Sequence, residues 1–364
     1  MKNTLGESVA LTLFGESHGV AIGAVLDGLA PGIAVDEDFI AKQMDLRRSV
    51  SSLSTARKEA DTVHIVSGVV NGITTGTPIT FIIQNGDHHS SDYEKMRSIA
   101  RPGHADYTAY CKYHGHSDIR GGGHFSGRIT AGIVAAGGVV IPALKKRGIT
   151  IGTHISRCAG VCDRAFENLG ADLSALNEKS FAVLDEDRAA QMKAAIAHAK
   201  AEGDSVGGVL ETAVIGVPRG VGEPWFDTLE SVLSRALFSI PAVKGVEFGD
   251  GFALADMRGS EANDAFRVQN GEIVCATNHN GGILGGITSG MPIVFRTAIK
   301  PTPSIYKEQQ TVDFMKKEET DLTIGGRHDP AIVHRARVVA DSVTALVLAD
   351  MLALRFGTDW LCGG

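Results

Sequence analysis

The stretch Gly72-Ile73-Thr74-Thr75-Gly76-Thr77-Pro78-Ile79-Thr80-Phe81 decides the fold, because the chain repeats it at 286–295. The second copy, Gly-Ile-Thr-Ser-Gly-Met-Pro-Ile-Val-Phe, is identical at seven of ten positions. Each copy reads as a glycine turn followed by a β-branched strand. Upstream of each copy, a strand and a turn with proline and glycine lead to an acidic helix start, at Asp36 and Asp227. A unit of strand, helix, strand and strand is therefore expected twice, near 18–84 and 207–299; chance similarity of glycine turns is the alternative.

The remaining pattern is that of a mixed helix and strand protein without a linker. Apolar residues recur at helical spacing in three segments, at 129–146, 187–202 and 337–354. Short β-branched runs predict strands at 20–26, 63–70, 79–83, 149–155, 209–217 and 293–299. We therefore expect one domain over residues 1–364, with its two halves packed around a pseudo-two-fold axis.

The overall charge argues against a nucleic-acid partner. The formal net charge is −7, and no dense run of lysine and arginine occurs. Several arginines nevertheless lie at glycine-rich loops, which suggests a small anionic ligand; scattered surface arginines are the alternative. The odd count of 5 cysteines and the lack of a signal-peptide pattern predict a soluble, cytoplasmic protein. The apolar run 129–144 contains glycines and a proline, and we expect it to fall short of a membrane span.

Two glycine-flanked loops each present a histidine, in Gly-Glu-Ser-His-Gly at 15–19 and in Arg-Pro-Gly-His-Ala-Asp at 101–106. A histidine held on such a loop can transfer protons near neutral pH. The first loop also fits the nucleophile elbow of hydrolases, which requires a helix directly after it. Residues 20–26 read as a strand, so Ser17 is expected to position a ligand; a serine hydrolase remains the less favoured alternative.

The loop Arg-Gly-Gly-Gly-His-Phe-Ser-Gly-Arg at 120–128 is the strongest single motif. Its glycines allow close backbone approach, and the following helix points its first amides at the loop, so we expect a phosphate or carboxylate here. A tight structural turn is the alternative. The loops 278–286 and 300–304 offer amides, hydroxyls and one cation, which suit a phosphate-bearing cofactor.

A metal site is less favoured. His88, His89, His114, His116 and His124 lie within forty residues, yet no recognised zinc spacing occurs among them. We therefore expect no metal.

Taken in order, these loops resemble the chorismate synthase family along essentially the whole chain. The matching motifs are Phe-Gly-Glu-Ser-His-Gly at 14–19, Arg-Pro-Gly-His-Ala-Asp-Tyr at 101–107, Arg-Gly-Gly-Gly at 120–123, Ala-Val-Lys-Gly-Val-Glu at 242–247, Gly-Asp-Gly-Phe at 249–252, Asn-His-Asn-Gly-Gly-Ile-Leu-Gly-Gly at 278–286, Lys-Pro-Thr at 300–302 and Gly-Arg-His-Asp-Pro at 326–330.

The resemblance implies an α+β fold, a single-domain β-α-β sandwich with an internal pseudo-two-fold repeat, assembled as a homotetramer. It also implies a lyase of the shikimate pathway. The substrate, 5-enolpyruvylshikimate 3-phosphate, would lose phosphate and its C6 proton in a 1,4-anti elimination that gives chorismate. The family requires reduced FMN; an external flavin reductase, with NADPH as an indirect reductant, would supply it. Self-reduction with NADPH stays open.

The resemblance assigns roles to individual residues. His18 would hold or protonate the reduced flavin, His104 would act as general acid at the leaving phosphate, and Asp329 would assist departure of the C6 proton. The expected substrate contacts are Arg47, Arg48, Arg101 and Arg128, with Arg327 a further candidate. The expected flavin contacts are His124, Phe125, Ser126, Gly285, Lys300, Pro301, Thr302, Pro303, Ser304 and Arg327.

Some positions depart from the family pattern. The loop Ser49-Val50-Ser51-Ser52-Leu53 is shorter and lacks an expected Pro-Gly and a further arginine, while Pro241 and Pro303 replace a common Asn and Ser. Because both histidines remain, we expect activity to survive. Besides the hydrolase, a non-catalytic anion-binding protein is the third hypothesis, and ligand-facing histidines argue against it.

Overall fold

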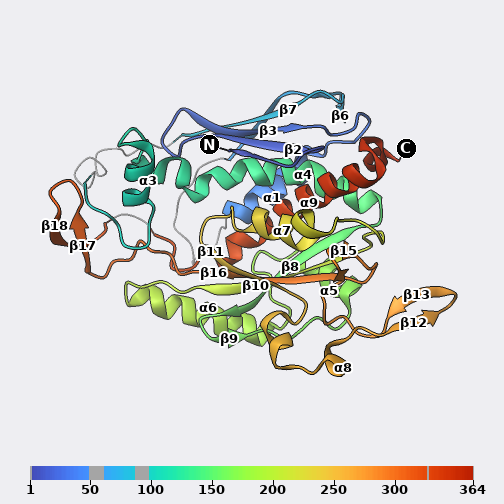
Figure 1. The fold of residues 1–364 in the computed structure, drawn as a ribbon. Helices are drawn as coiled ribbons and strands as arrows, with labels where there is room; N and C mark the ends of the chain where they lie inside the picture. Colours follow the sequence, from blue (N-terminus) through green and yellow to red (C-terminus); the bar gives the residue numbers. More distant parts are fainter. Residues whose placement is uncertain (1, 49–60, 87–97, 326–327, 364) are drawn as a thin grey trace.

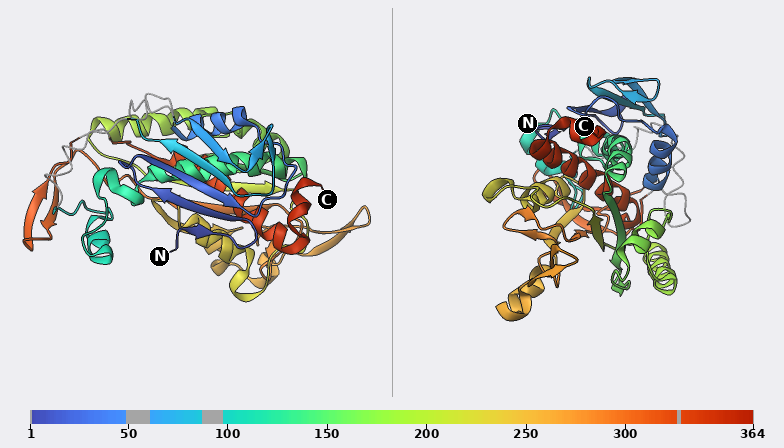
Figure 2. Two further views of the ribbon diagram at one scale, coloured as in Figure 1. Left: turned by 90° about the horizontal axis from the view of Figure 1, so that it is seen from above. Right: turned by 90° about the vertical axis from the view of Figure 1, so that its right-hand side faces the viewer.

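Two antiparallel sheets enclose a layer of helices, as seen in Figure 1 and in the right-hand view of Figure 2. The computed structural model describes residues 2–48, 61–86, 98–325 and 328–363. This arrangement confirms the expected α+β sandwich.

The first sheet has the strand order β1-β2-β3-β7-β4, and every neighbouring pair is antiparallel. Its strands are β1 (Thr4–Leu5), β2 (Ala10–Gly15), β3 (Ala21–Asp27), β4 (Val63–Ser67) and β7 (Ile79–Gln84). The second sheet has the order β11-β16-β10-β8-β9. Its strands are β8 (Thr150–Cys158), β9 (Val161–Cys162), β10 (Gly208–Ile215), β11 (Val243–Phe248) and β16 (Ile293–Ile299).

The same three-strand topology occurs in both sheets, at the segments that resemble each other in sequence. In the first half, β7 pairs with β3 on one side and β4 on the other. In the second half, β16 pairs in the same way with β10 and β11. Each half inserts a helix after its first strand and a glycine-turn hairpin before its last. The hairpins are β5–β6 (Val69–Val70 and Ile73–Thr74) and β14–β15 (Ile283–Leu284 and Ile287–Thr288).

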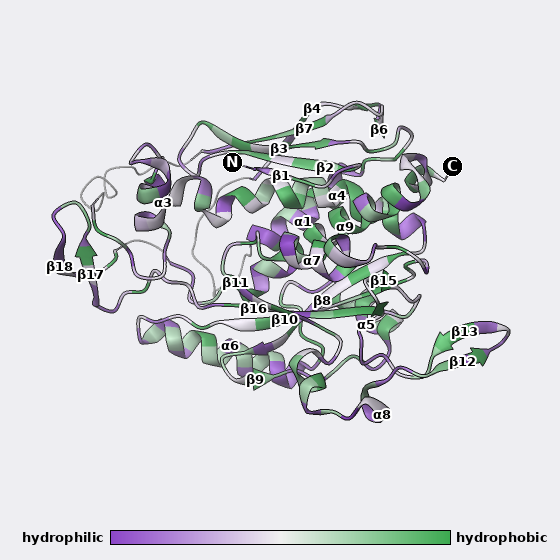
Figure 3. Cartoon of the chain, viewed as in Figure 1, coloured by the Kyte–Doolittle hydropathy of each residue, from purple (hydrophilic) through white to green (hydrophobic). Residues whose placement is uncertain are grey.

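The helix layer forms the core between the sheets. It contains α1 (Glu37–Arg48), α4 (Thr130–Lys146), α7 (Leu229–Leu237) and α9 (Val333–Phe356). Helices α4 and α9 are mostly buried and largely hydrophobic (Figure 3). They pack closely because α4 carries Gly137, where a Cβ would lie 2.4 Å from the Cβ of Ser342.

The remaining elements lie outside the sandwich. The helices are α3 (Asp106–Tyr113), α5 (Leu169–Leu176), α6 (Glu186–Ala201) and α8 (Gly259–Ala262), and the short 3-10 turns are 120–125, 127–129, 225–227, 251–256 and 358–362. Two hairpins extend from opposite ends of the body in Figure 1: β12–β13 (Phe266–Gln269 and Glu272–Cys275) and β17–β18 (Gln309–Asp313 and Glu318–Leu322).

Two expectations from the sequence need correction. The strand expected at 63–70 is interrupted at Gly68, whose φ of 80° bends the chain out of the sheet. The apolar run at 129–144 belongs to a helix, Gly127–Lys146, that by length and composition could cross a membrane. Because 83% of its most apolar window is buried inside the protein, the helix is explained by its place in the core.

The N-terminal segment is fastened to α9 by one carboxylate. Asp350 is buried, and it accepts hydrogen bonds from the backbone N–H groups of Glu7, Ser8 and Val9 at 2.7–3.1 Å. Three backbone donors ahead of β2 are thereby satisfied by a single side chain.

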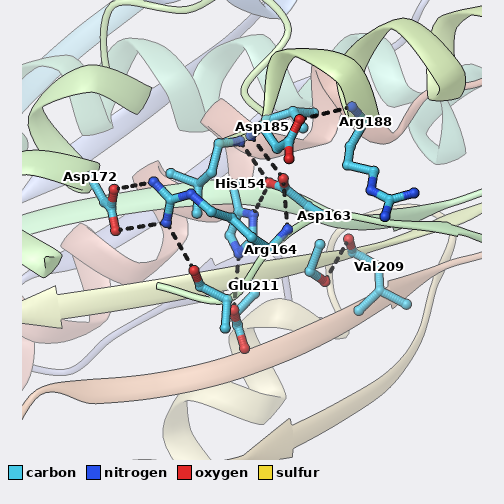
Figure 4. Close-up of polar contacts among 12 residues, drawn as sticks. His154, Asp163, Arg164, Asp172, Asp185, Arg188, Val209 and Glu211 are labelled. Carbon is cyan, nitrogen blue, oxygen red and sulfur yellow. Dashed lines mark hydrogen bonds and ion pairs between the residues drawn. The ribbon is translucent and has the colours of Figure 1, made fainter. Parts of the chain in front are cut away.

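A buried ionic cluster joins the outer face of the second sheet to the segment before α6 (Figure 4). The ring of His154 lies between two carboxylates, with Nδ1 2.7 Å from Asp163 and Nε2 2.9 Å from Glu211. Asp163 also accepts the backbone N–H groups of Leu184 and Asp185 before α6. Burial alone would lower the pKa of His154, but the hydrogen bonds to the two carboxylates outweigh it and raise that pKa.

We expect His154→Gln to destabilise the protein most at acidic pH. Because the pKa of His154 is raised on folding, its stabilisation is complete below the ordinary value of 6.5 and is lost as pH rises through the folded-state pKa. The free energy of unfolding should fall by about 3–5 kcal/mol near pH 6, the usual effect of breaking a buried ion pair. Urea unfolding of both proteins at several pH values measures the difference between their free energies of unfolding, which should become smaller at higher pH. A difference that grows with pH would contradict the charged pairing. His198→Ala, at an exposed histidine, is the control.

Candidate active site

The loop that carries His18 joins β2 to β3. Ser17 and His18 are buried, and the Ser17 N–H donates to the carbonyl of Gly123 at 3.1 Å. Asn85 Nδ2 donates to the carbonyls of Glu16 and Gly19 at 3.1 and 2.9 Å. After the loop the chain enters β3 and forms no helix, so the elbow geometry that a serine nucleophile requires is missing.

The glycine loop at 120–125 brings the two histidines together. Gly121, Gly122 and Gly123 have φ values of 59°, 85° and 54°, which favour glycine. A Cβ on Gly121 would lie 2.7 Å from Cε1 of His18, and one on Gly122 would lie 3.4 Å from Nε2 of His104. Two rings from distant parts of the sequence thus pack on consecutive glycines. The sequence suggested that these glycines admit an anion. In the structure, the positions that a Cβ would occupy at Gly121 and Gly122 lie against imidazole rings.

His104 ends a tight turn that begins at Arg101. The His104 N–H donates to the Arg101 carbonyl at 3.1 Å, with Pro102 and a positive φ at Gly103 between them, which is typical of a type II turn. Lys300 follows directly after β16, and its Nζ donates to the Gly103 carbonyl at 2.5 Å. A Cβ on Gly103 would lie 3.3 Å from Pro303. The turn of the first half therefore touches the 300–304 segment of the second half.

The hairpin β17–β18 supports the chain just before this turn. The Ala100 N–H donates to the Val312 carbonyl at 3.1 Å, and the Phe314 N–H donates to the Ser98 carbonyl at 2.9 Å. The Phe314 ring also packs against Tyr110 of α3, with 4.9 Å between ring centroids. Helix α3 and the hairpin thus lie side by side (Figure 1) and together hold the His104 turn.

Asp106, at the start of α3, binds both Arg101 and His104. Arg101 forms a fork on it, with Nε 2.8 Å from Oδ2 and Nη2 2.7 Å from Oδ1, and its backbone N–H adds a bond of 3.0 Å. Nδ1 of His104 lies 3.1 Å from Oδ1 of the same carboxylate. Burial alone would raise the pKa of Asp106, but hydrogen bonds from Arg101 and His104 hold it well below its ordinary value.

Arg47 and Arg128 share a second buried carboxylate, Asp61. Nη1 of Arg47 lies 3.1 Å from Asp61, and Arg128 contacts the other oxygen. Arg47 also donates to Thr130 Oγ1 at 3.0 Å, and Arg128 donates to Asn85 Oδ1 at 3.0 Å. In this conformation the two guanidinium groups hold the start of α4 against the His18 loop.

Asp329 joins this network through Arg335 of α9. Arg335 Nη1 pairs with the Asp329 carboxylate, and its Nε donates to the Arg47 carbonyl at 2.9 Å. Arg48, the next residue, is half-buried and pairs with Asp45. Arg327, expected to contact flavin and substrate, lies outside the described residues, as do the loop at 49–53 and the histidines at 88 and 89.

The expected flavin contacts fall into separate groups. His124 Nδ1 lies 2.7 Å from the Gly15 carbonyl, and Ser126 Oγ accepts the Arg128 N–H at 3.3 Å, so both belong to the histidine loops. Phe125 is exposed, with its ring 6.0 Å from Tyr113. The 300–304 segment touches the His104 turn through Lys300 and Pro303.

Gly285 is not brought to the other expected contacts within one chain. It lies in the β14–β15 hairpin, beside the first residues of β16, whereas Lys300 follows the last. A strand of seven residues, roughly 20 Å, separates these two ends. Flavin contact at Gly285 stays a prediction.

Sequence reasoning missed three residues that organise the site. Asp106 had a local signal, because it lies two positions after His104 in the quoted motif. Asp61 and Arg335 had none, since their partners are distant in sequence. Among the described residues no group of three or more histidine, cysteine or acidic side chains is placed to hold a metal.

Comparisons with known proteins agree along nearly the whole chain. The family model described as chorismate synthase matches residues 9–353. The chain is 48% identical to chorismate synthase of Thermococcus gammatolerans over 352 residues, covering 96% of this chain and 97% of that protein. It is 46% identical to that of Dehalococcoides mccartyi, covering 98% of each.

A solved structure supports the same assignment. A crystal structure of chorismate synthase superimposes with a TM-score of 0.76 at 28% identity, covering 97% of this chain and 94% of that one. Fold, motifs and relatives therefore agree, and the chain belongs to the chorismate synthase family.

Proposed function

We propose that this protein is a lyase that eliminates phosphate from 5-enolpyruvylshikimate 3-phosphate to give chorismate, and that it requires reduced FMN. The observation that carries the proposal is the placement of His18 and His104 on consecutive glycines, with Lys300 fastened to the His104 turn. A leaving phosphate needs a proton and positive charge, and these residues offer both.

One observation of the chain itself indicates that the residues expected at the flavin site fit this cofactor. Within the expected flavin segment, Thr302 Oγ1 is buried and has no hydrogen-bond partner among the described residues. Ser304 beside it is also buried, and Lys300 adds a cation. We assign the 300–304 segment and His124 to holding the cofactor. Reduced FMN, when bound, supplies an electron transiently to help expel the phosphate.

The chain's own residues divide the remaining work. His104 donates the proton that the leaving phosphate needs, and His18 holds a proton beside the cofactor. Asp329, oriented by Arg335, assists departure of the C6 proton. Substrate contact by Arg47, Arg48, Arg101 and Arg128 stays a prediction, because in this conformation these four guanidinium groups bind carboxylates of the chain.

Three further properties belong to the same proposal. A homotetramer is expected from the family resemblance, together with a cytoplasmic location. No dinucleotide fingerprint occurs in the sequence, which favours an external flavin reductase, with NADPH as its electron source, over self-reduction.

We expect the purified protein to form chorismate and phosphate only when FMN is reduced. The measurement mixes protein, substrate and dithionite-reduced FMN without oxygen, and follows chorismate absorbance and phosphate release. Oxidised FMN and omission of FMN are the controls. Turnover without flavin, or flavin binding without any turnover, would contradict the proposal.

A further inference from the structure

The contacts around His104 define a role for a residue that carries no function in the proposal above. We propose that Asp106 is a positioning residue: it accepts a hydrogen bond from the Nδ1–H of His104 and thereby keeps Nε2 as the atom that exchanges a proton with the substrate. The inference rests on the proposed function, in which His104 is the general acid.

The distances on the two sides of the His104 ring distinguish its two nitrogens. Nδ1 lies 3.1 Å from Oδ1 of Asp106. Nε2 lies on the side of Gly122, 3.4 Å from the position that a Cβ on this glycine would occupy. The preceding residue, Gly121, contacts the ring of His18. The nitrogen farther from the carboxylate is therefore the one on the side of the glycine loop that also contacts His18.

Arg101 complicates this assignment, because its Nη2 also lies 3.1 Å from Nδ1. Nδ1 cannot donate to Asp106 and accept from Arg101 at once. If it accepted from Arg101, the neutral ring would carry its only proton on Nε2, and releasing that proton would leave an imidazolate. If it donates to Asp106, the ring gives up the Nε2 proton as an imidazolium and becomes an ordinary neutral imidazole. The second arrangement suits a general acid.

The surroundings explain how Asp106 keeps this role. Arg101 makes its fork with both oxygens, and the carboxylate therefore stays ionised, as the lowered pKa of Asp106 also indicates. All three side chains are largely shielded from water, with exposed fractions of 12% for Arg101, 20% for His104 and 14% for Asp106. A charge-assisted hydrogen bond in such surroundings is stronger than one in water.

The test reads the ring directly and then reads catalysis. In protein labelled with ¹⁵N-histidine, the His104 signals are assigned by their loss in His104→Ala. We expect the neutral ring to carry its proton on Nδ1, and Asp106→Asn to move it to Nε2. With reduced FMN and substrate, Asp106→Asn should lower kcat by about tenfold to hundredfold, with KM nearly unchanged, because the wrong tautomer is present.

A matched control separates this role from general stability. Asp172→Asn makes the same change at another shielded carboxylate that pairs with an arginine, Arg164, and should leave kcat unchanged. A wild-type ring protonated on Nε2 would overturn the inference, and so would an unchanged kcat in Asp106→Asn. The ring signals need no turnover, so an inactive wild type would contradict the proposed function and leave the tautomer result standing.

Discussion

His104→Ala is expected to lower kcat for chorismate formation by about 10²- to 10⁴-fold, the range over which a general acid contributes. The reason is local: without the imidazole, the ring that lies against Gly122 can no longer protonate the departing phosphate. Lys300 and the backbone turn remain, so substrate binding should change much less than turnover. Phosphate release under reduced FMN measures kcat, and substrate titration of the protein measures binding.

The matched control for this variant is His198→Ala. His198 is exposed on α6 and its ring lies 3.5 Å from Glu202 at the surface, so its loss should not change the rate. An unchanged kcat in His104→Ala would remove the general-acid role. A loss of substrate binding as large as the loss of rate would instead make His104 a binding residue.

Gly121→Ala is expected to inactivate the enzyme almost as strongly, although it changes no ionisable group. The new Cβ would lie 2.7 Å from Cε1 of His18 and within 3.0 Å of both ring nitrogens, so the ring must move. The residue would also keep a φ near 59°, which costs a non-glycine residue about 1–2 kcal/mol. We expect kcat to fall about a hundredfold, because small displacements of a catalytic group have effects of this size.

The same loop supplies the control. A Cβ added at Gly127 would have no other atom within 4 Å, and the φ of this residue is not positive, so Gly127→Ala should be close to wild type. Rate measurements and thermal unfolding of both variants separate the effects. Full activity in Gly121→Ala would show that the contact between this glycine and His18 is not needed for turnover.

The fold can be predicted from the sequence largely because of its repeat. Hydrophobic periodicity locates α4, α6 and α9 to within a few residues, since long buried helices have strong patterns. The similarity between 72–81 and 286–295 indicates that β7 and β16 are equivalent, and both are the middle strand of a corresponding trio. Gly68 shows the limit, because a single glycine inside a β-branched run does not reveal that the strand ends there.

The candidate site is predictable only in part, for a physical reason. Histidines on glycine-flanked loops can be recognised locally, but the partner that holds each ring is a tertiary contact. Nothing in the sequence pairs Asp61 with two arginines that are distant from each other, or Arg335 with the end of α1. The glycines at 121–123 do admit a close approach, and at two of them the group that approaches is a histidine of the protein itself. Binding of an anion at this loop stays a prediction.

The Asp350 clamp has a consequence for the order in which this protein is made. The carboxylate that satisfies the N–H of Glu7 leaves the ribosome 343 residues after Glu7 itself. During synthesis the segment ahead of β2 must therefore wait, with its backbone donors bound to water, until α9 has emerged. The segment between β1 and β2 therefore gains its last hydrogen bonds only after α9 has been synthesised.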